Sequence, residues 1–163
     1  MKLHLHSLDR MGVPARTAWL MFGIACSRFG DQSRGQEILD GLRALLRGKR
    51  RGEIRWPSVA DWRDPLVFEF LKGLLTSPDE SWHPVASAEM DRLTNPDGPF
   101  TRYQKGFDVE DPIQEEEQPP SAEYWLAWLE SHEKQLEWVD EPQDVRRGRF
   151  GWWRVRPDGT QAK

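Results

Sequence analysis

The stretch that decides the fold is residues 64–75, which read DPLVFEFLKGLL. Asp64 and Pro65 signal the start of a helix, because an aspartate oxygen can accept a free backbone N–H and proline suits the first helical position. Six apolar residues follow at the three- and four-residue spacing of one helix face: Leu66, Val67, Phe70, Leu71, Leu74 and Leu75. A stripe this wide predicts a helix that buries one face in a core.

Two more helices are predicted before this stretch. The first begins near Pro14, ends near Gly30 and is expected to be largely buried, since its apolar residues cover a wide stripe. That stripe consists of Trp19, Phe22, Cys26 and Phe29, broadened by Leu20, Met21 and Ile24. The second runs to Gly48 from a capping box of Ser33 and Gln36, in which each side chain satisfies a free backbone N–H. Its apolar face consists of Ile38, Leu39, Leu42, Leu45 and Leu46.

Two further helices are predicted after residue 75. A short one is expected around 86–93. Residues 94–120 then form a long loop rich in proline and acidic residues, which offers little to bury. Ser121 caps a second helix over 121–138, since serine is a preferred N-cap residue. One face of this helix carries Trp125, Trp128, Leu129, His132 and Leu136.

Short strands are predicted at the two ends of the sequence. Residues 2–8 place leucines and histidines at alternate positions, which is the period of a half-buried strand. Residues 145–156 alternate weakly and are followed by a Pro-Asp-Gly turn signal. We expect the two strands to pair. The sequence therefore predicts a mostly helical α+β fold, with four to five short helices and a small sheet formed by the N- and C-terminal strands.

The composition indicates one globular domain over residues 1–163. Hydrophobic residues make up 37% of the chain, and nine tryptophans and seven phenylalanines supply the bulk of a core. No apolar run approaches the roughly 20 residues of a membrane span. One cysteine excludes an internal disulfide framework, and the polar first residues do not resemble a secretory signal, so a cytoplasmic location is expected.

The chain offers no recognisable catalytic motif. His4 and His6 would share one strand face, but a metal site needs further ligands at motif spacing. Cys26 falls in an apolar stripe, where a thiol is inert. Ser131 and Lys134 match S-x-x-K without its companion motifs. We therefore expect no catalytic residue, no metal and no cofactor. An enzyme with a site of unfamiliar pattern is the alternative.

Charge is distributed unevenly along the chain. Residues 107–144 hold 13 acids and one base, a net charge of −12. Residues 145–163 carry +5 and residues 1–106 carry +3. Such asymmetry indicates either electrostatic steering of a partner or neutralisation of one region by another.

The leading hypothesis is a small non-catalytic interaction protein that binds a protein partner through an acidic, tryptophan-bearing surface. Rows of carboxylates can imitate the phosphates of a duplex, so the partner could be a nucleic-acid-handling complex that the protein inhibits. Inhibitors of this size are typical of phages and mobile elements, an analogy of type alone. The candidate contact residues are Glu115, Glu116, Glu117, Glu130, Glu133, Glu137, Trp138 and Asp140.

Two alternatives stay open. The first is direct nucleic-acid binding, because arginines can neutralise phosphates while tryptophans stack on bases. Its candidates lie in segments 43–55 and 146–156: Arg43, Arg47, Lys49, Arg50, Arg51, Arg55, Arg146, Arg147, Arg149, Arg154 and Arg156. The test is whether the two segments meet on one face. The second alternative is an oligomeric structural or assembly component.

Overall fold

The computed structural model describes residues 13–27, 29–49, 59, 62–95, 119–140 and 151–157, with side chains described from residue 16 onward. Within these ranges the α-helices are α2 (Val13–Ser27), α3 (Gly35–Leu46), α4 (Leu66–Leu75), α5 (His83–Thr94) and α7 (Ala122–His132). Two short 3₁₀ turns, η2 (Glu80–Trp82) and η3 (Glu133–Gln135), precede α5 and follow α7. The strands are β1 (Leu136–Asp140) and β2 (Gly151–Val155). The predicted mostly helical α+β class is confirmed.

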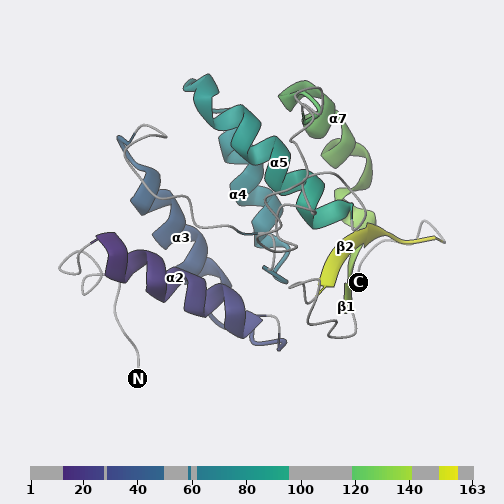
Figure 1. The fold of residues 1–163 in the computed structure, drawn as a ribbon. Coiled ribbons are helices and arrows are strands. Elements are labelled where there is room, and N and C mark those ends of the chain that lie inside the picture. Colours follow the sequence, from purple (N-terminus) through teal and green to yellow (C-terminus); the bar gives the residue numbers. More distant parts are fainter. Residues whose placement is uncertain are drawn as a thin grey trace, which may run out of the picture.

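Helix α4 lies between α3 and the pair α5 and α7, and it buries the predicted apolar face. It packs against α3 on one side and against α5 and α7 on the other (Figure 1). Five of the six residues in its predicted stripe are buried, and Leu66 is half-buried. Asp64 accepts a hydrogen bond from the Leu66 N–H at 3.0 Å, so the predicted start signal is confirmed. Phe68, which the predicted stripe omits, is also buried.

The sheet consists of β1 and β2, which pair antiparallel with Leu136 opposite Val155 and Asp140 opposite Gly151. The predicted C-terminal strand is confirmed, but its partner is a segment that we expected to be helical. The predicted helix over 121–138 is wrong beyond His132, because the chain changes there through η3 into extended backbone. Residues 136–140 instead pair with β2 as a strand. Trp138 and Val139 favour this extended conformation, because aromatic and β-branched residues are enriched in strands. The predicted strand at 2–8 lies outside the described residues.

Alternation gives the sheet an inner and an outer face. Leu136 and Trp153 point inward and are buried. The Trp153 ring meets Phe68 of α4 edge to face, with ring centroids 5.2 Å apart. Its Nε1 donates to the Trp62 carbonyl at 3.2 Å. Glu137 and Arg154 occupy the outer face, where their side chains bond at 2.7 Å. Trp153 therefore packs the sheet against the helical core.

Helix α2 ends at Ser27 and buries only part of the predicted stripe. The inward residues are Leu20, Gly23, Ile24 and Ser27, whereas Phe22 is 62% and Phe29 is 80% exposed. Glycines select this face. A Cβ atom at Gly23 would lie 2.9 Å from Ile38, and one at Gly41 would lie 2.7 Å from Leu20. The two helices approach closely along these glycines. Of the predicted stripe, Leu20 and Ile24 are buried and Trp19, Met21 and Cys26 are half-buried, so the prediction is wrong for Phe22 and Phe29.

Of the two predicted serine caps, one forms. Ser121 accepts from the Tyr124 N–H at 3.2 Å and caps α7. Ser33 makes no cap to α3. Its backbone N–H and its hydroxyl both donate to Asp31 Oδ1, at 3.1 and 2.6 Å. The Gln36 side chain donates to Asp40 instead. The predicted capping box is wrong because a nearer carboxylate binds the serine.

Two glycines are expected to respond in opposite ways to alanine. A Cβ atom at Gly35 would overlap the carboxylate of buried Asp64, so Gly35→Ala should lower the free energy of unfolding by about 2 kcal/mol. Nothing lies within 4 Å of a Cβ at exposed Gly73, and Gly73→Ala should raise it by about 0.5–1 kcal/mol through helix propensity alone. Urea denaturation measures both. Equal effects would show that α3 and α4 do not meet at Gly35.

Candidate interaction surface

The predicted acidic surface falls on three consecutive elements. Among its described members, Glu130 lies on α7, Glu133 on η3, and Glu137, Trp138 and Asp140 lie on β1. Glu115, Glu116 and Glu117 lie outside the described residues. The structure therefore brings the described residues to one end of the molecule, beside the sheet.

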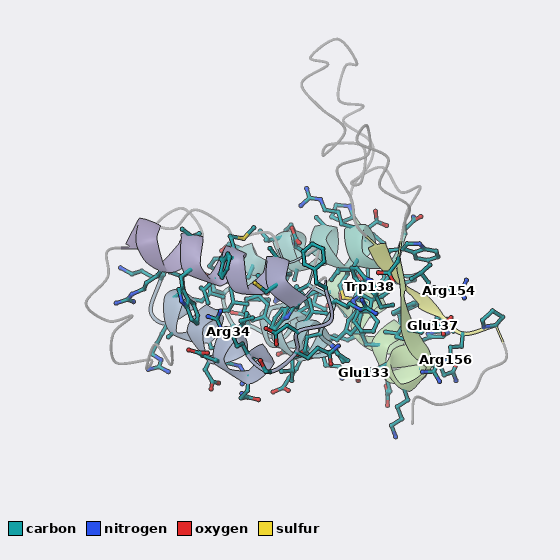
Figure 2. The ribbon with its side chains drawn as sticks, turned by 90° about the horizontal axis from the view of Figure 1, so that it is seen from below. Arg34, Glu133, Glu137, Trp138, Arg154 and Arg156 are labelled. Carbon is teal, nitrogen blue, oxygen red and sulfur yellow. The ribbon has the colours of Figure 1, made fainter. Side chains whose placement is uncertain are left out.

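Most of these carboxylates are neutralised by cations from distant parts of the chain. Glu133 binds Lys72 of α4. Glu137 lies 2.7 Å from Arg154 and 3.5 Å from Arg156, and Figure 2 shows these three residues beside the sheet. Asp140 lies 3.7 Å from Arg63. This part of the acidic segment forms ion pairs with basic residues elsewhere in the chain. Such neutralisation of one region by another is one of the two interpretations of the uneven charge distribution.

Trp138 and Glu137 point to opposite faces of the sheet. The Trp138 ring lies on the inner face and meets Trp153 edge to face, with ring centroids 5.8 Å apart. Its Nε1 donates to Asp140 Oδ1 at 2.9 Å. Both the ring and its polar atom are occupied within the chain, and the side chain is half-buried. Trp138 therefore contributes to the packing of the sheet. It lies on a strand, and not at the end of the predicted helix over 121–138.

The outward side of α7 carries carboxylates of a different kind. Trp125 and Leu129 point into the core, so Glu123, Ala127 and Glu130 point away from it. Glu123 and Glu130 make no ion pair with any described residue. Tyr124 stands beside them and is 51% exposed, with its ring 5.1 Å from that of Trp125. We call Glu123, Tyr124, Ala127 and Glu130 the α7 face.

The sequence analysis predicted one member of the α7 face, Glu130, and missed the other three, Glu123, Tyr124 and Ala127. The signal was present in the spacing. Trp125 and Leu129 belong to the core side of the helix. Helical spacing then places Glu123 and Glu130 on the opposite side, which faces solvent. The prediction from charge instead selected the acidic run at 115–117 and residues 137, 138 and 140, which form part of β1.

Among the described residues, two exposed carboxyls have a pKa below the usual value. The pKa of Glu123 lies below its usual value because its own backbone N–H and the Ser121 hydroxyl bond the carboxylate. The pKa of Asp31 is lowered by the Ser33 hydroxyl and then by the Ser33 backbone N–H. Both groups therefore stay ionised to a lower pH than an ordinary surface carboxyl. The negative charge of Glu123 is therefore fully present at neutral pH.

The described parts of the two basic segments lie far apart. Arg43, Arg47 and Lys49 lie on or just after α3, and Arg43 bonds Glu69 of α4 at 2.7 Å. Arg154 and Arg156 lie beside Glu137, at the opposite end of the molecule from α3 (Figure 1). These five cations do not form one patch. The remaining candidates, Arg50, Arg51, Arg55, Arg146, Arg147 and Arg149, lie outside the described residues.

The described residues form neither a metal centre nor a membrane-spanning helix. In the described part of the chain, no group of three or more His, Cys, Asp or Glu side chains is placed to hold a metal ion. No helix there combines the length and apolar character that a membrane crossing requires. Comparison of the chain with protein-family models, curated proteins and solved structures finds no match.

Proposed function

We propose that the chain is a small non-catalytic interaction protein that binds a protein partner through the acidic surface centred on the α7 face. The observation that carries this proposal is the exposed side chain of Tyr124 on the same helix as the exposed carboxylates of Glu123 and Glu130. Tyrosine is enriched among residues that dominate binding energy, because it offers a large rigid surface with a polar tip. Carboxylates without an internal cation can instead attract one from a partner.

The charge of the surrounding segment indicates the chemistry of the partner. Residues 107–144 carry a net charge of −12, and this field attracts a basic surface. Basic channels are typical of nucleic-acid-handling complexes, which bind phosphates through lysine and arginine. An acidic protein lying in such a channel would inhibit the complex. The paired residues Glu133, Glu137 and Asp140 then serve mainly to fold the sheet onto the helices.

The experiment is an affinity pull-down from host lysate with a matched set of baits. Removing two charges with Glu123→Gln and Glu130→Gln should weaken recovery of the partner about tenfold and flatten its salt dependence, because rim charges steer association. Tyr124→Ala should weaken recovery by at least as much, as loss of a hot-spot ring does. The control carries Gln36→Lys and Ala44→Lys on exposed α3 positions, which change the net charge equally.

The outcomes separate the hypotheses. A partner that survives nuclease treatment, binds the control and loses the α7 variants supports the proposal. Equal recovery with all baits contradicts it. Recovery of nucleic acid, or of partners that nuclease removes, would favour the alternative of direct nucleic-acid binding through the arginine-rich segments.

A further inference from the structure

The outer face of the sheet carries an aromatic ring and two cations in one row. Trp152 and Arg154 are two positions apart on β2, so both side chains point outward, opposite to buried Trp153. Arg156 follows the strand, and its N–H donates to the Gln135 carbonyl at 2.9 Å, which extends the pairing of the two chain segments. Its side chain therefore belongs to the same face. We call Trp152, Arg154 and Arg156 the β2 row.

The Trp152 ring is half-buried and has no ring partner in the described part of the chain. Its neighbour Trp153 meets Phe68 and Trp138 edge to face. No described residue accepts a hydrogen bond from the indole N–H of Trp152. The exposed part of this ring is therefore available to stack on a planar group of a ligand.

One carboxylate positions both cations of the β2 row. Arg154 Nε donates to Glu137 at 2.7 Å, and Arg156 Nε lies 3.5 Å from the same carboxylate. Figure 2 shows the three residues together beside the sheet. Glu137 supplies one negative charge against two positive charges, so the row keeps an excess positive charge. A guanidinium has five N–H donors, and the bond from Arg154 Nε leaves others for a phosphate oxygen.

The charges around the β2 row favour an anionic ligand, although the whole chain is acidic. The other acids of η3 and β1 are Glu133, which binds Lys72, and Asp140, which lies 3.7 Å from Arg63. These pairs reduce the negative field of the acidic segment at the sheet. Residues 145–163, which include β2, carry a net charge of +5. A positive segment of this kind attracts the phosphates of a nucleic acid.

We propose that the β2 row binds single-stranded nucleic acid, with one base stacked on Trp152 and neighbouring phosphates bound by Arg154 and Arg156. Alternate residues of a strand are about 6.7 Å apart, so the two guanidiniums can reach successive phosphates of an extended strand. Aromatic rings that stack on bases, combined with cations along the backbone, are typical of binding to single strands without sequence preference. The inference is independent of the α7 face and of its protein partner.

Fluorescence anisotropy with a labelled oligothymidylate of about 15 nucleotides tests the proposal, a length in the range that small single-strand binders cover. At about 50 mM salt the full chain should bind it with a dissociation constant in the micromolar range. Trp152→Ala should weaken binding about tenfold through the loss of stacking. Trp152→Phe keeps a ring and should weaken binding less. A duplex of the same length should bind more weakly than the single strand, because its bases are already stacked in pairs.

Charge variants separate the β2 row from general electrostatic attraction. Arg154→Gln combined with Arg156→Gln should weaken binding about tenfold. The slope of log K against log salt should also fall by about 1.4, since each single-strand phosphate contributes about 0.7. The control combines Arg43→Gln and Arg47→Gln, which change the net charge equally at the α3 end of the molecule. It should weaken binding by less than about twofold, because salt screens distant charges. Circular dichroism confirms that each variant is folded.

Three results would overturn the proposal. The first is no binding of the oligothymidylate at protein concentrations up to about 100 μM, the weak end of non-specific binding. The second is binding that Trp152→Ala leaves unchanged, since charge alone would then account for it. The third is an equal loss of affinity in the α3 control and in the variant that lacks Arg154 and Arg156.

Discussion

Replacing Trp153 by alanine is expected to lower the free energy of unfolding by about 4 kcal/mol, as removal of a buried tryptophan does. The side chain is 4% exposed and belongs to the core. Its ring contacts Phe68 and Trp138, and its Nε1 donates to the Trp62 carbonyl. The substitution removes all of these contacts and leaves a cavity between the sheet and α4. Urea denaturation followed by tryptophan fluorescence and circular dichroism measures the loss.

The neighbouring tryptophan provides the matched control. Trp152 is half-buried and points to the outer face of the sheet, because adjacent strand residues alternate. Trp152→Ala makes the same chemical change and should cost about 1 kcal/mol, since little packing is lost at a partly exposed site. A larger loss at 152 than at 153 would mean that the sheet faces the core with its other side.

Glu89→Ala is expected to cost about 3 kcal/mol, in the range measured when one partner of a buried ionic network is removed. Glu89 is 1% exposed on α5. One carboxylate oxygen accepts from the Val59 N–H at 3.1 Å, and the other accepts from Arg92 at 2.7 Å. Without the carboxylate, a buried N–H and a guanidinium lose an acceptor. Thermal and urea unfolding both report the change.

An exposed ion pair gives the comparison for Glu89. Glu69 binds Arg43 at the same 2.7 Å, but both side chains are about half exposed. Glu69→Ala should change stability by less than about 1 kcal/mol, because surface pairs contribute little in water. Glu89→Gln should lose less than Glu89→Ala, since an amide oxygen can still accept from Val59. If Glu69 and Glu89 proved equally important, the burial of Glu89 would be in doubt.

Local signals predicted the elements that local interactions determine. The start of α4 at Asp64 and Pro65, its apolar face, and the Ser121 cap of α7 all depend on residues within four positions of each other. A single amphipathic pattern was sufficient for α3 as well. These features require no knowledge of the rest of the fold.

The errors arose where two parts of the chain must meet. Apolar residues on α2 offered two faces, and glycines at 23 and 41 decided which one packs on α3. Residues 136–140 continue a helical pattern from α7, but pairing with 151–155 makes them a strand. Pattern analysis weighs side chains one segment at a time. It has no means of scoring a close approach or a ladder of hydrogen bonds to a distant segment.

The candidate surface was predictable in its charge and not in its detail. Counting acids located the acidic segment, and α7 and β1 do lie within it. The cations that neutralise it come from far along the chain, since Lys72 and Glu133 are 61 positions apart. No count along the sequence separates a carboxylate that is paired in this way from one, such as Glu130, that is open to a partner.

The bond between Trp153 and Trp62 joins residues 91 positions apart. Helices α2 and α3 are close in sequence, and their contact requires only a short loop to close. Phe68 is fully covered only when Trp153 of β2 packs on it. Closing so long a loop costs chain entropy before any contact compensates it. We expect a chain in which β2 has not yet docked to expose Phe68 and Trp62 to water. Such a form would be prone to association with other chains through this apolar surface.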